Sequence, residues 1–118
     1  MIISLGPIPP LVNITKDPPI TIYGDAFNIL CTAVTPVIYP NLIWSLQDMS
    51  PKTIVIVRSG KTLKTCQNTM FNGTMKRVKT CVVTLQSVTM RDAGEYSCMA
   101  SNAVDSASVS LDVIIKGE

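Results

Sequence analysis

Short runs in which apolar and polar residues alternate cover most of this chain, and turn residues separate them at a spacing of roughly eight to twelve residues. Residues 27–34 alternate around Cys31, and a similar run near the end contains Ala107, Val109, Leu111 and Val113. Alternation with a period of two places the apolar side chains on one face of a β-strand. About eight or nine such strands, without a convincing helix, are typical of a β-sandwich.

The other strands follow from the same pattern. Residues 21–25 are the end of a short strand and the turn that follows it. Residues 42–46 alternate around Trp44, the only tryptophan. Residues 53–57 are a β-branched run, which we interpret as an edge strand. Residues 61–85 are expected to turn back at the signal Phe-Asn-Gly-Thr, residues 71–74, and to form one hairpin with long arms.

Length, charge and composition exclude several functions. The chain has 118 residues, 47% of them hydrophobic, so we predict one domain over residues 1–118. Its net charge of +2 comes without a basic run long enough for a nucleic-acid backbone. Histidine, the commonest general base and metal ligand, does not occur, and no nucleophile is paired with a base. We predict no enzyme activity, cofactor, metal or nucleic-acid partner.

The two ends of the chain predict neither a signal peptide nor a membrane span. The opening meets prolines early and lacks a basic segment, and no apolar run approaches the roughly 20 residues that cross a bilayer. Met1 is read most simply as an added initiator, and the chain stops just after a strand-like run. We expect a domain excised from a larger chain, without membrane contact by this segment.

The cysteines and two sequons bear on the cellular compartment. Four cysteines allow three pairings, or four free thiols in a cytosolic domain: Cys31, Cys66, Cys81 and Cys98. Asn13 and Asn72 each begin an N-x-[ST] sequon, the glycan acceptor of secreted chains. Together with the even cysteine count, the sequons favour an oxidising, extracellular setting.

One set of residues is far more specific. Cys31 is followed thirteen residues later by Trp44, and further along by the motif Asp92-x-Gly94-x-Tyr96-x-Cys98. This arrangement resembles the immunoglobulin superfamily over essentially the whole chain. The resemblance implies an all-β, immunoglobulin-like Greek-key β-sandwich. It also implies that Cys31 pairs with Cys98, that Trp44 packs against this bond, and that Tyr96 donates its hydroxyl to backbone a few residues upstream.

The subtype stays open between the I-set and a V/I intermediate. Pro40-x-Leu42-x-Trp44 and Ala100-x-Asn102 resemble the I-set, but Asp105 stands where its last hairpin has glycine. The stretch between the paired cysteines approaches V-set length, which an additional edge strand between Ser59 and Thr65 would explain.

A second disulfide is expected between the remaining cysteines. Cys66 and Cys81 lie symmetrically about Gly73-Thr74, so in the predicted hairpin they would face each other and staple its arms. The alternative, a redox switch, has no supporting sequence feature. This pair also departs from a family that the second half loosely resembles through Leu63-Lys64-Thr65 and residues 88–98, the membrane-proximal immunoglobulin domain of fibroblast growth factor receptors.

Recognition through a sheet face is a common use of such a fold, and one face has apolar candidates. Ile43 and Met99 are expected on the outer face of their sheet, where the pair Ile54 and Ile56 or the pair Val55 and Val57 would join them. We take as the candidate interface Ile43, Met99, Val55 and Val57. The alternative is that they are ordinary exposed aliphatic side chains.

Two further surface features have simpler interpretations. The basic cluster Met75-Lys76-Arg77-Val78-Lys79 could bind a glycosaminoglycan, but we expect its charges to keep an edge strand soluble instead. Asn72 is an accessible glycan site at the hairpin tip, and Asn13 should lie on an irregular edge.

Three functions fit these observations. The first is an extracellular recognition module of a membrane-anchored adhesion or recognition receptor, which binds another protein or a copy of itself. The second is the ligand-binding ectodomain of a signalling receptor of the receptor tyrosine kinase type. The third is an intracellular I-set structural domain of a filament-associated protein, which predicts free thiols and no glycan.

Overall fold

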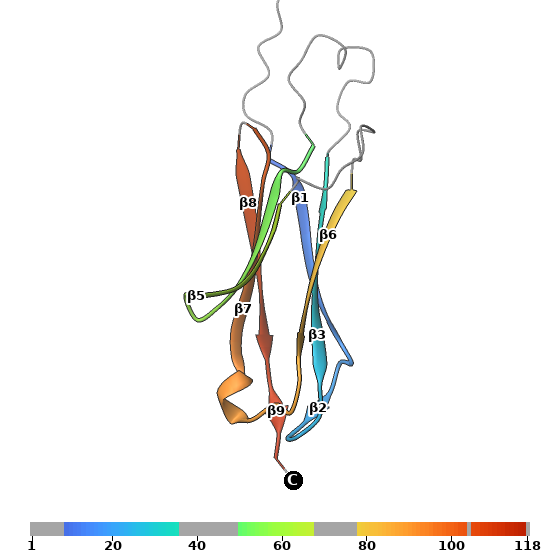
Figure 1. Cartoon of the computed structure of the whole chain (residues 1–118), viewed down its shortest axis with the longest axis vertical. Coiled ribbons are helices and arrows are strands. Elements are labelled where there is room, and N and C mark those ends of the chain that lie inside the picture. Colours follow the sequence, from blue (N-terminus) through green and yellow to red (C-terminus); the bar gives the residue numbers. More distant parts are fainter. Residues whose placement is uncertain (1–8, 36–49, 68–77, 104, 118) are drawn as a thin grey trace, which may run out of the picture.

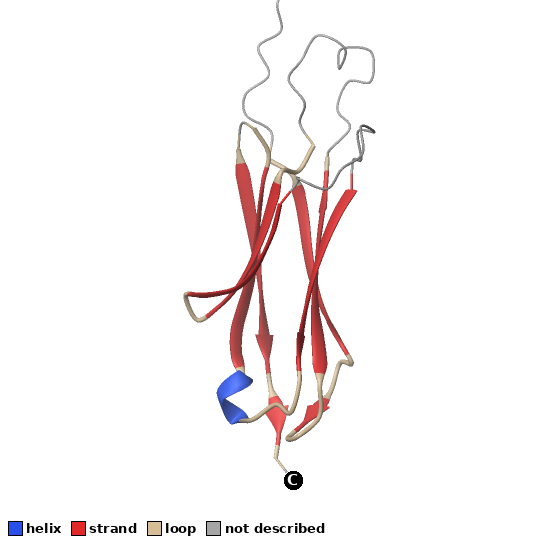
Figure 2. Ribbon diagram, in the orientation of Figure 1, coloured by secondary structure: helices blue, strands red, loops and turns tan. Residues whose placement is uncertain are grey.

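The chain folds as two packed β-sheets, as predicted (Figures 1 and 2). The computed structural model describes residues 9–35, 50–67, 78–103 and 105–117. Within these residues there are nine strands and one short 3-10 helix. The predictions for Ile43, Trp44 and Asn72 lie outside the described residues, as do the predicted strand at residues 42–46 and the turn at residues 71–74.

The first sheet has three antiparallel strands in the order β1-β3-β6. These are β1 (Leu11–Asp17), β3 (Phe27–Val34) and β6 (Val78–Leu85). The alternating residues of β3 point inward as the pattern predicts, and the four inward ones are buried: Phe27, Ile29, Cys31 and Ala33. Asn13 lies in regular strand at the β1 edge, so the expected irregular edge is wrong; the alternation of β1 lets it pair fully with β3.

The second sheet has four strands in the order β5-β4-β7-β8. These are β5 (Lys61–Gln67), β4 (Thr53–Arg58), β7 (Gly94–Ser101) and β8 (Ser106–Val113). Because β4 pairs with both β5 and β7, the prediction of an edge strand at residues 53–57 is wrong. The additional strand expected between Ser59 and Thr65 is present as β5, which forms the edge of this sheet.

The predicted hairpin over residues 61–85 is also wrong, because β5 and β6 belong to different sheets. β5 instead pairs with β4 through a tight turn at Ser59 and Gly60, whose φ angles are 49° and 83°. Positive φ at both central residues gives the twist that two-residue hairpin turns need. The turn therefore commits β5 to the sheet of β4.

A short parallel pair joins the first and last parts of the chain at the lower end in Figure 1. It consists of β2 (Thr21–Ile22) and β9 (Ile115–Lys116). The 3-10 helix, Met90–Asp92, lies at the same end and leads into β7. The residues of this helix therefore set the position at which β7 begins.

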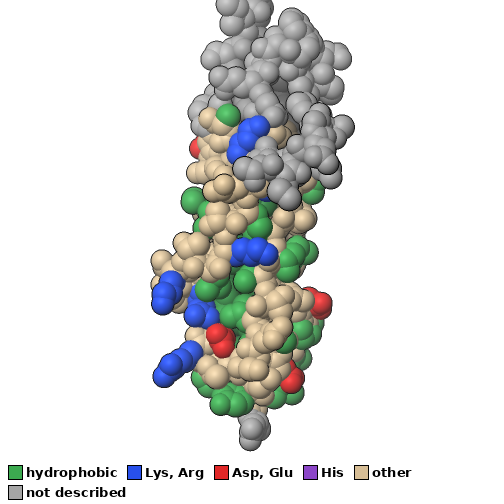
Figure 3. Space-filling view, in the orientation of Figure 1, with side chains coloured by type: hydrophobic (Ala, Val, Ile, Leu, Met, Phe, Trp, Pro, Cys, Tyr) green, Lys and Arg blue, Asp and Glu red, His purple; other side chains and the backbone are tan. Residues whose placement is uncertain are grey.

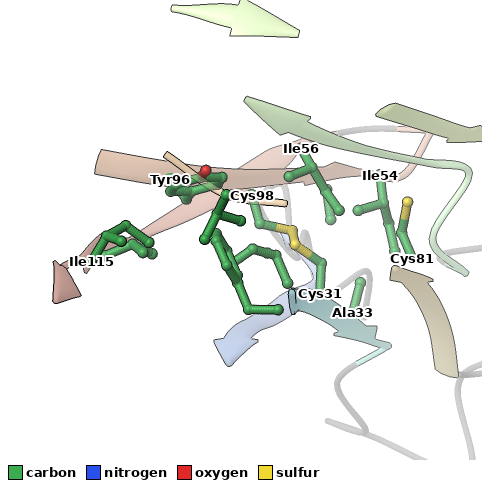
Figure 4. Close-up of a cluster of buried hydrophobic side chains, with 13 residues drawn as sticks. Cys31, Ala33, Ile54, Ile56, Cys81, Tyr96, Cys98 and Ile115 are labelled. Atoms are coloured by element: carbon green, nitrogen blue, oxygen red, sulfur yellow. A yellow bond between two sulfur atoms is a disulfide. The ribbon is translucent and has the colours of Figure 1, made fainter. Parts of the chain in front are cut away.

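The hydrophobic core fills the space between the sheets. Figure 4 shows the Cys31–Cys98 bond inside a cluster to which β3, β4 and β7 contribute, with Ile54 and Ile56 beside it. Phe27 and Tyr96 pack edge to face, with ring centroids 5.8 Å apart and planes at 78°. Both aromatic side chains are almost completely buried, so the two sheets meet through them as well as through the disulfide.

Candidate functional site

Two disulfides join the two sheets. Cys31 on β3 pairs with Cys98 on β7, with the Cα atoms 6.2 Å apart, which confirms the pairing that the resemblance implied. Cys66 on β5 pairs with Cys81 on β6, with the Cα atoms 5.9 Å apart. The second pairing is also confirmed. Its expected role as a staple between the arms of one hairpin is wrong, because β5 and β6 lie in different sheets. The bond instead links the two sheets.

The two bridges are neighbours in the fold. Cys31 and Cys81 are directly opposite each other in the β3–β6 pair. On the other sheet, Cys98 is opposite Ile56 and Cys66 is opposite Ile54. The β4 isoleucines therefore lie beside the bridges, and both side chains are fully buried.

The β5 edge has one further link to the first sheet. Lys64 Nζ donates a hydrogen bond of 2.6 Å to the backbone carbonyl of Val82 on β6. Together with the Cys66–Cys81 bridge, this contact fastens the β5 and β6 edges, where Figure 3 shows basic side chains beside hydrophobic ones. The β5 edge of one sheet is therefore held against the β6 edge of the other.

Asp92 organises the entry to β7 through both its backbone carbonyl and its carboxylate. The Tyr96 hydroxyl donates to the Asp92 carbonyl oxygen at 2.6 Å, the upstream backbone bond that the resemblance implied. The Asp92 carboxylate accepts from the backbone N–H of Thr89 at 2.8 Å, which completes a capping box on the 3-10 helix. Burial raises the pKa of the Tyr96 phenol, so this hydroxyl stays a donor across the physiological pH range.

Arg58 completes this cluster, although its role was not predicted from the sequence. It is opposite Tyr96 in the β4–β7 pair, and its guanidinium forms an ion pair of 2.9 Å with the Asp92 carboxylate. Its spacing could have identified it, because Arg58 lies two residues after Ile56 and so continues the series of β4 side chains that point inward. Gly94 is the first residue of β7, and its φ of 130° is a conformation that favours glycine.

Replacing Tyr96 by phenylalanine is expected to lower the free energy of unfolding by about 1 to 2 kcal/mol, because the Asp92 carbonyl loses its donor inside the fold. Urea denaturation of the oxidised protein measures this loss. Tyr23→Phe is the matched control: its side chain is 46% exposed, so a change within about 0.5 kcal/mol is expected. Equal losses in the two variants would contradict the role of the Tyr96 hydroxyl.

The last hairpin closes without the glycine that the I-set pattern expects. The Asn102 side chain accepts the N–H of Asp105 at 2.8 Å, and the N–H of Asn102 donates to the Asp105 carbonyl at 2.9 Å. The turn is therefore held by an asparagine side chain where a glycine conformation was expected.

The candidate interface residues gather on the outer face of the four-stranded sheet. Val55 is directly opposite Met99, whose side chain is 45% exposed, and Val57 is opposite Ser97 one row further. Ile54 and Ile56 point into the core, so of the two pairs considered, Val55 and Val57 face outward. Ile43 lies outside the described residues.

This outer face carries no charge over three successive rows of described residues. The neighbours of Val55, Val57 and Met99 are uncharged polar side chains: Thr53, Thr62, Thr65, Gln67, Ser97, Ser101, Ser106, Ser108 and Ser110. Ser97 and Ser110 hydrogen-bond across β7 and β8 at 3.1 Å. The face therefore has an apolar centre within a rim of small hydroxyl side chains.

The basic cluster does not behave as predicted where the structure describes it. The Lys79 side chain is only 6% exposed, and its ammonium donates to the Lys52 carbonyl at 2.8 Å. Burial lowers the pKa of Lys79, and the nearby Lys52 charge lowers it further. Lys79 points inward because it shares the inward series of Cys81, so the expected solubilising role is wrong for this residue. Residues 75–77 lie outside the described residues.

Among the described residues, no group of three or more His, Cys, Asp or Glu side chains could hold a metal ion. No helix in the described ranges is long and apolar enough to cross a membrane.

A match to a known protein family agrees with the fold. Residues 21–111 match the family described as immunoglobulin domain. No curated protein sequence matches the chain. Among solved structures, the human B7-H4 IgV-like domain is similar, with 18% sequence identity, a TM-score of 0.48, and coverage of 91% of this chain and 98% of that one. Because the family match spans most of the chain and coincides with a two-sheet sandwich bridged by Cys31 and Cys98, the chain belongs to the immunoglobulin domain family.

Proposed function

We propose that this domain is an extracellular recognition module of a membrane-anchored adhesion or recognition receptor. It binds a protein partner, a second copy of itself included, through the outer face of the β5-β4-β7-β8 sheet. The observation that carries the proposal is the apolar centre formed by Val55, Val57 and Met99, on a face whose described residues carry no charge over three rows. Interface centres are depleted of charged residues in this way, and methionine is enriched there.

The extracellular placement has its own support. The structure contains both disulfides and no free cysteine. Disulfides persist in oxidising compartments and are rare in the cytosol. This favours a surface receptor over the intracellular filament domain, which predicts free thiols. The likeness to fibroblast growth factor receptors stays a prediction.

The size of the face indicates weak binding by a single domain. Four strands about 4.8 Å apart and about seven residues long present roughly 400 Å² per partner. A stable complex usually buries about 800 Å² per partner, so a contact limited to this face is transient. Display of several copies on a surface would raise the overall affinity through avidity.

The proposal predicts that Met99→Glu weakens association at least tenfold, because it places a charge at the desolvated centre of the face. Fluorescent tetramers of the secreted domain would be tested on a panel of cells, and self-association would be measured by sedimentation velocity at increasing concentration. Val55→Lys should act in the same way, since Val55 is paired with Met99.

Ile114→Glu is the matched control, because Ile114 is 75% exposed and lies between β8 and β9, beyond the end of the three uncharged rows. It should leave both readouts unchanged. The proposal is wrong if Met99→Glu and Val55→Lys bind cells and self-associate as strongly as the control. If the two variants lose cell binding and the parent domain does not self-associate, the partner is a different protein and not a second copy.

A further inference from the structure

The outer face of the other sheet, β1-β3-β6, carries two apolar rows. One row crosses all three strands and consists of Leu11, Val34 and Val78; Leu11 is 61% exposed and Val78 48%. The second row contains Leu30 and Val82, which are opposite each other and 37% and 38% exposed. The register therefore aligns exposed aliphatic side chains into two stripes.

The row between the stripes is polar and contains a sequon asparagine. Asn13 is exposed and opposite Thr32, which is in turn opposite Thr80. Within the sequon, Ile14 points inward and packs against the core, whereas Thr15 is exposed on the same face as Asn13. The strand alternation thus presents both the acceptor amide and its threonine to solvent.

The described residues of this face include few of the charges that usually protect an exposed sheet. Edge strands commonly carry charged side chains, lysine above all, that oppose pairing with another chain. The outward positions of β6 are all uncharged: Val78, Thr80, Val82 and Thr84. The lysine of this strand, Lys79, points inward, and in the described rows of this face a charge occurs only at Asp17, at the far end of β1.

We propose that Asn13 carries an N-linked glycan that lies over the two apolar rows and protects this face. The proposal rests on the extracellular placement proposed above. The donor is a lipid-pyrophosphate-linked oligosaccharide of the secretory pathway. The Asn13 amide nitrogen forms a bond to C1 of the first N-acetylglucosamine and loses a proton, while the C1–oxygen bond breaks and the lipid pyrophosphate leaves with the electron pair.

The geometry lets a short glycan core reach both rows. Successive outward positions on one strand are about 6.7 Å apart, and the three strands together span roughly 10 Å. Leu30 and Val34 therefore lie one row from Asn13 on either side. The apolar ring faces of the first sugars can cover these side chains while their hydroxyl groups stay in water. The glycan closes one face of the sandwich and leaves the Val55–Met99 face open to a partner.

Occupancy is tested first, on the chain secreted from a eukaryotic host. Peptide mass analysis before and after peptide N-glycosidase treatment should show Asn13 glycosylated in most molecules and converted to aspartate on release. Asn13→Gln should remove this glycan. Thr15→Ser, which preserves the sequon, should keep it. A bare Asn13 in the parent protein overturns the proposal.

Covering of the apolar rows is tested on the folded protein. Trimming the glycan to a single sugar with an endoglycosidase, or Asn13→Gln, should raise the fluorescence of a bound hydrophobic dye at least twofold. Adding Leu30→Thr and Val82→Thr to Asn13→Gln should reverse the rise. Unchanged dye fluorescence after trimming would show that the glycan does not cover this face. Met99→Glu should change neither the occupancy of Asn13 nor the size of the rise on trimming, so failure here is distinguishable from failure of the proposed partner face.

Discussion

Replacing Cys31 and Cys98 together by alanine is expected to lower the free energy of unfolding by about 4 kcal/mol. The bridge closes a loop with a sequence separation of 67, so it removes much conformational freedom from the unfolded chain. Domains of this size are stable by only about 5 to 15 kcal/mol, so the variant should lose a large share of its stability. Urea denaturation of the oxidised proteins measures the difference.

The second bridge supplies the comparison. Cys66 and Cys81 are separated by 15 positions, so replacing both by alanine is expected to cost about 3 kcal/mol. Both losses should be large if both bridges tie the sheets together. A loss below about 1 kcal/mol for the Cys31 and Cys98 variant would contradict the structural role assigned to that bridge.

Ile56→Ala is expected to cost about 2 to 5 kcal/mol, the second large effect. Ile56 is fully buried and opposite Cys98, so truncation leaves a cavity beside the inter-sheet bridge. Thermal or urea unfolding would be compared with that of Val55→Ala, the matched control on the same strand. Val55 faces outward and is only partly buried, so its truncation should cost less than about 1 kcal/mol.

This pair of variants tests the orientation of β4 directly. A large loss for Ile56→Ala beside a small one for Val55→Ala is expected if the isoleucines of β4 point into the core and its valines point outward. Similar small losses for both would contradict the inward position of Ile56. The two substitutions remove the same kinds of atom from adjacent positions, so propensity differences largely cancel.

The sequence predicted those parts of the fold that rest on alternation within one strand. Period-two spacing places Cys31, Tyr96 and Cys98 inward without any knowledge of pairing partners, and the structure buries all three. The family motif then supplies the partner of each cysteine. Alternation also restricts Val55 and Val57 to one face, although it cannot say which face is outward.

What the sequence did not predict depends on pairing between strands. The run at residues 53–57 is equally compatible with an edge and a central position, and its partners β5 and β7 decide between them. The symmetric spacing of Cys66 and Cys81 about a turn signal suggested one hairpin. The Ser59-Gly60 turn instead pairs β5 with β4, in the sheet opposite β6, which only the sheet topology shows.

Polar contacts within the fold were harder still to predict. Arg58 reaches Asp92 across 34 positions in the sequence, and Lys79 reaches the Lys52 carbonyl across 27. Both residues lie on the inward series of their strands, where a charged side chain is unusual. A charged residue on the inward side of an alternating strand is the signal that would have identified each of them.

Disulfide mapping of the secreted protein would show whether this is an extracellular immunoglobulin domain with two disulfide bridges between its sheets. Free thiols would be alkylated without reduction, and the digested peptides analysed by mass spectrometry. We expect two linked peptide pairs, Cys31 with Cys98 and Cys66 with Cys81, and no alkylated cysteine. Four alkylated cysteines with bare sequons would contradict it and favour the intracellular filament domain.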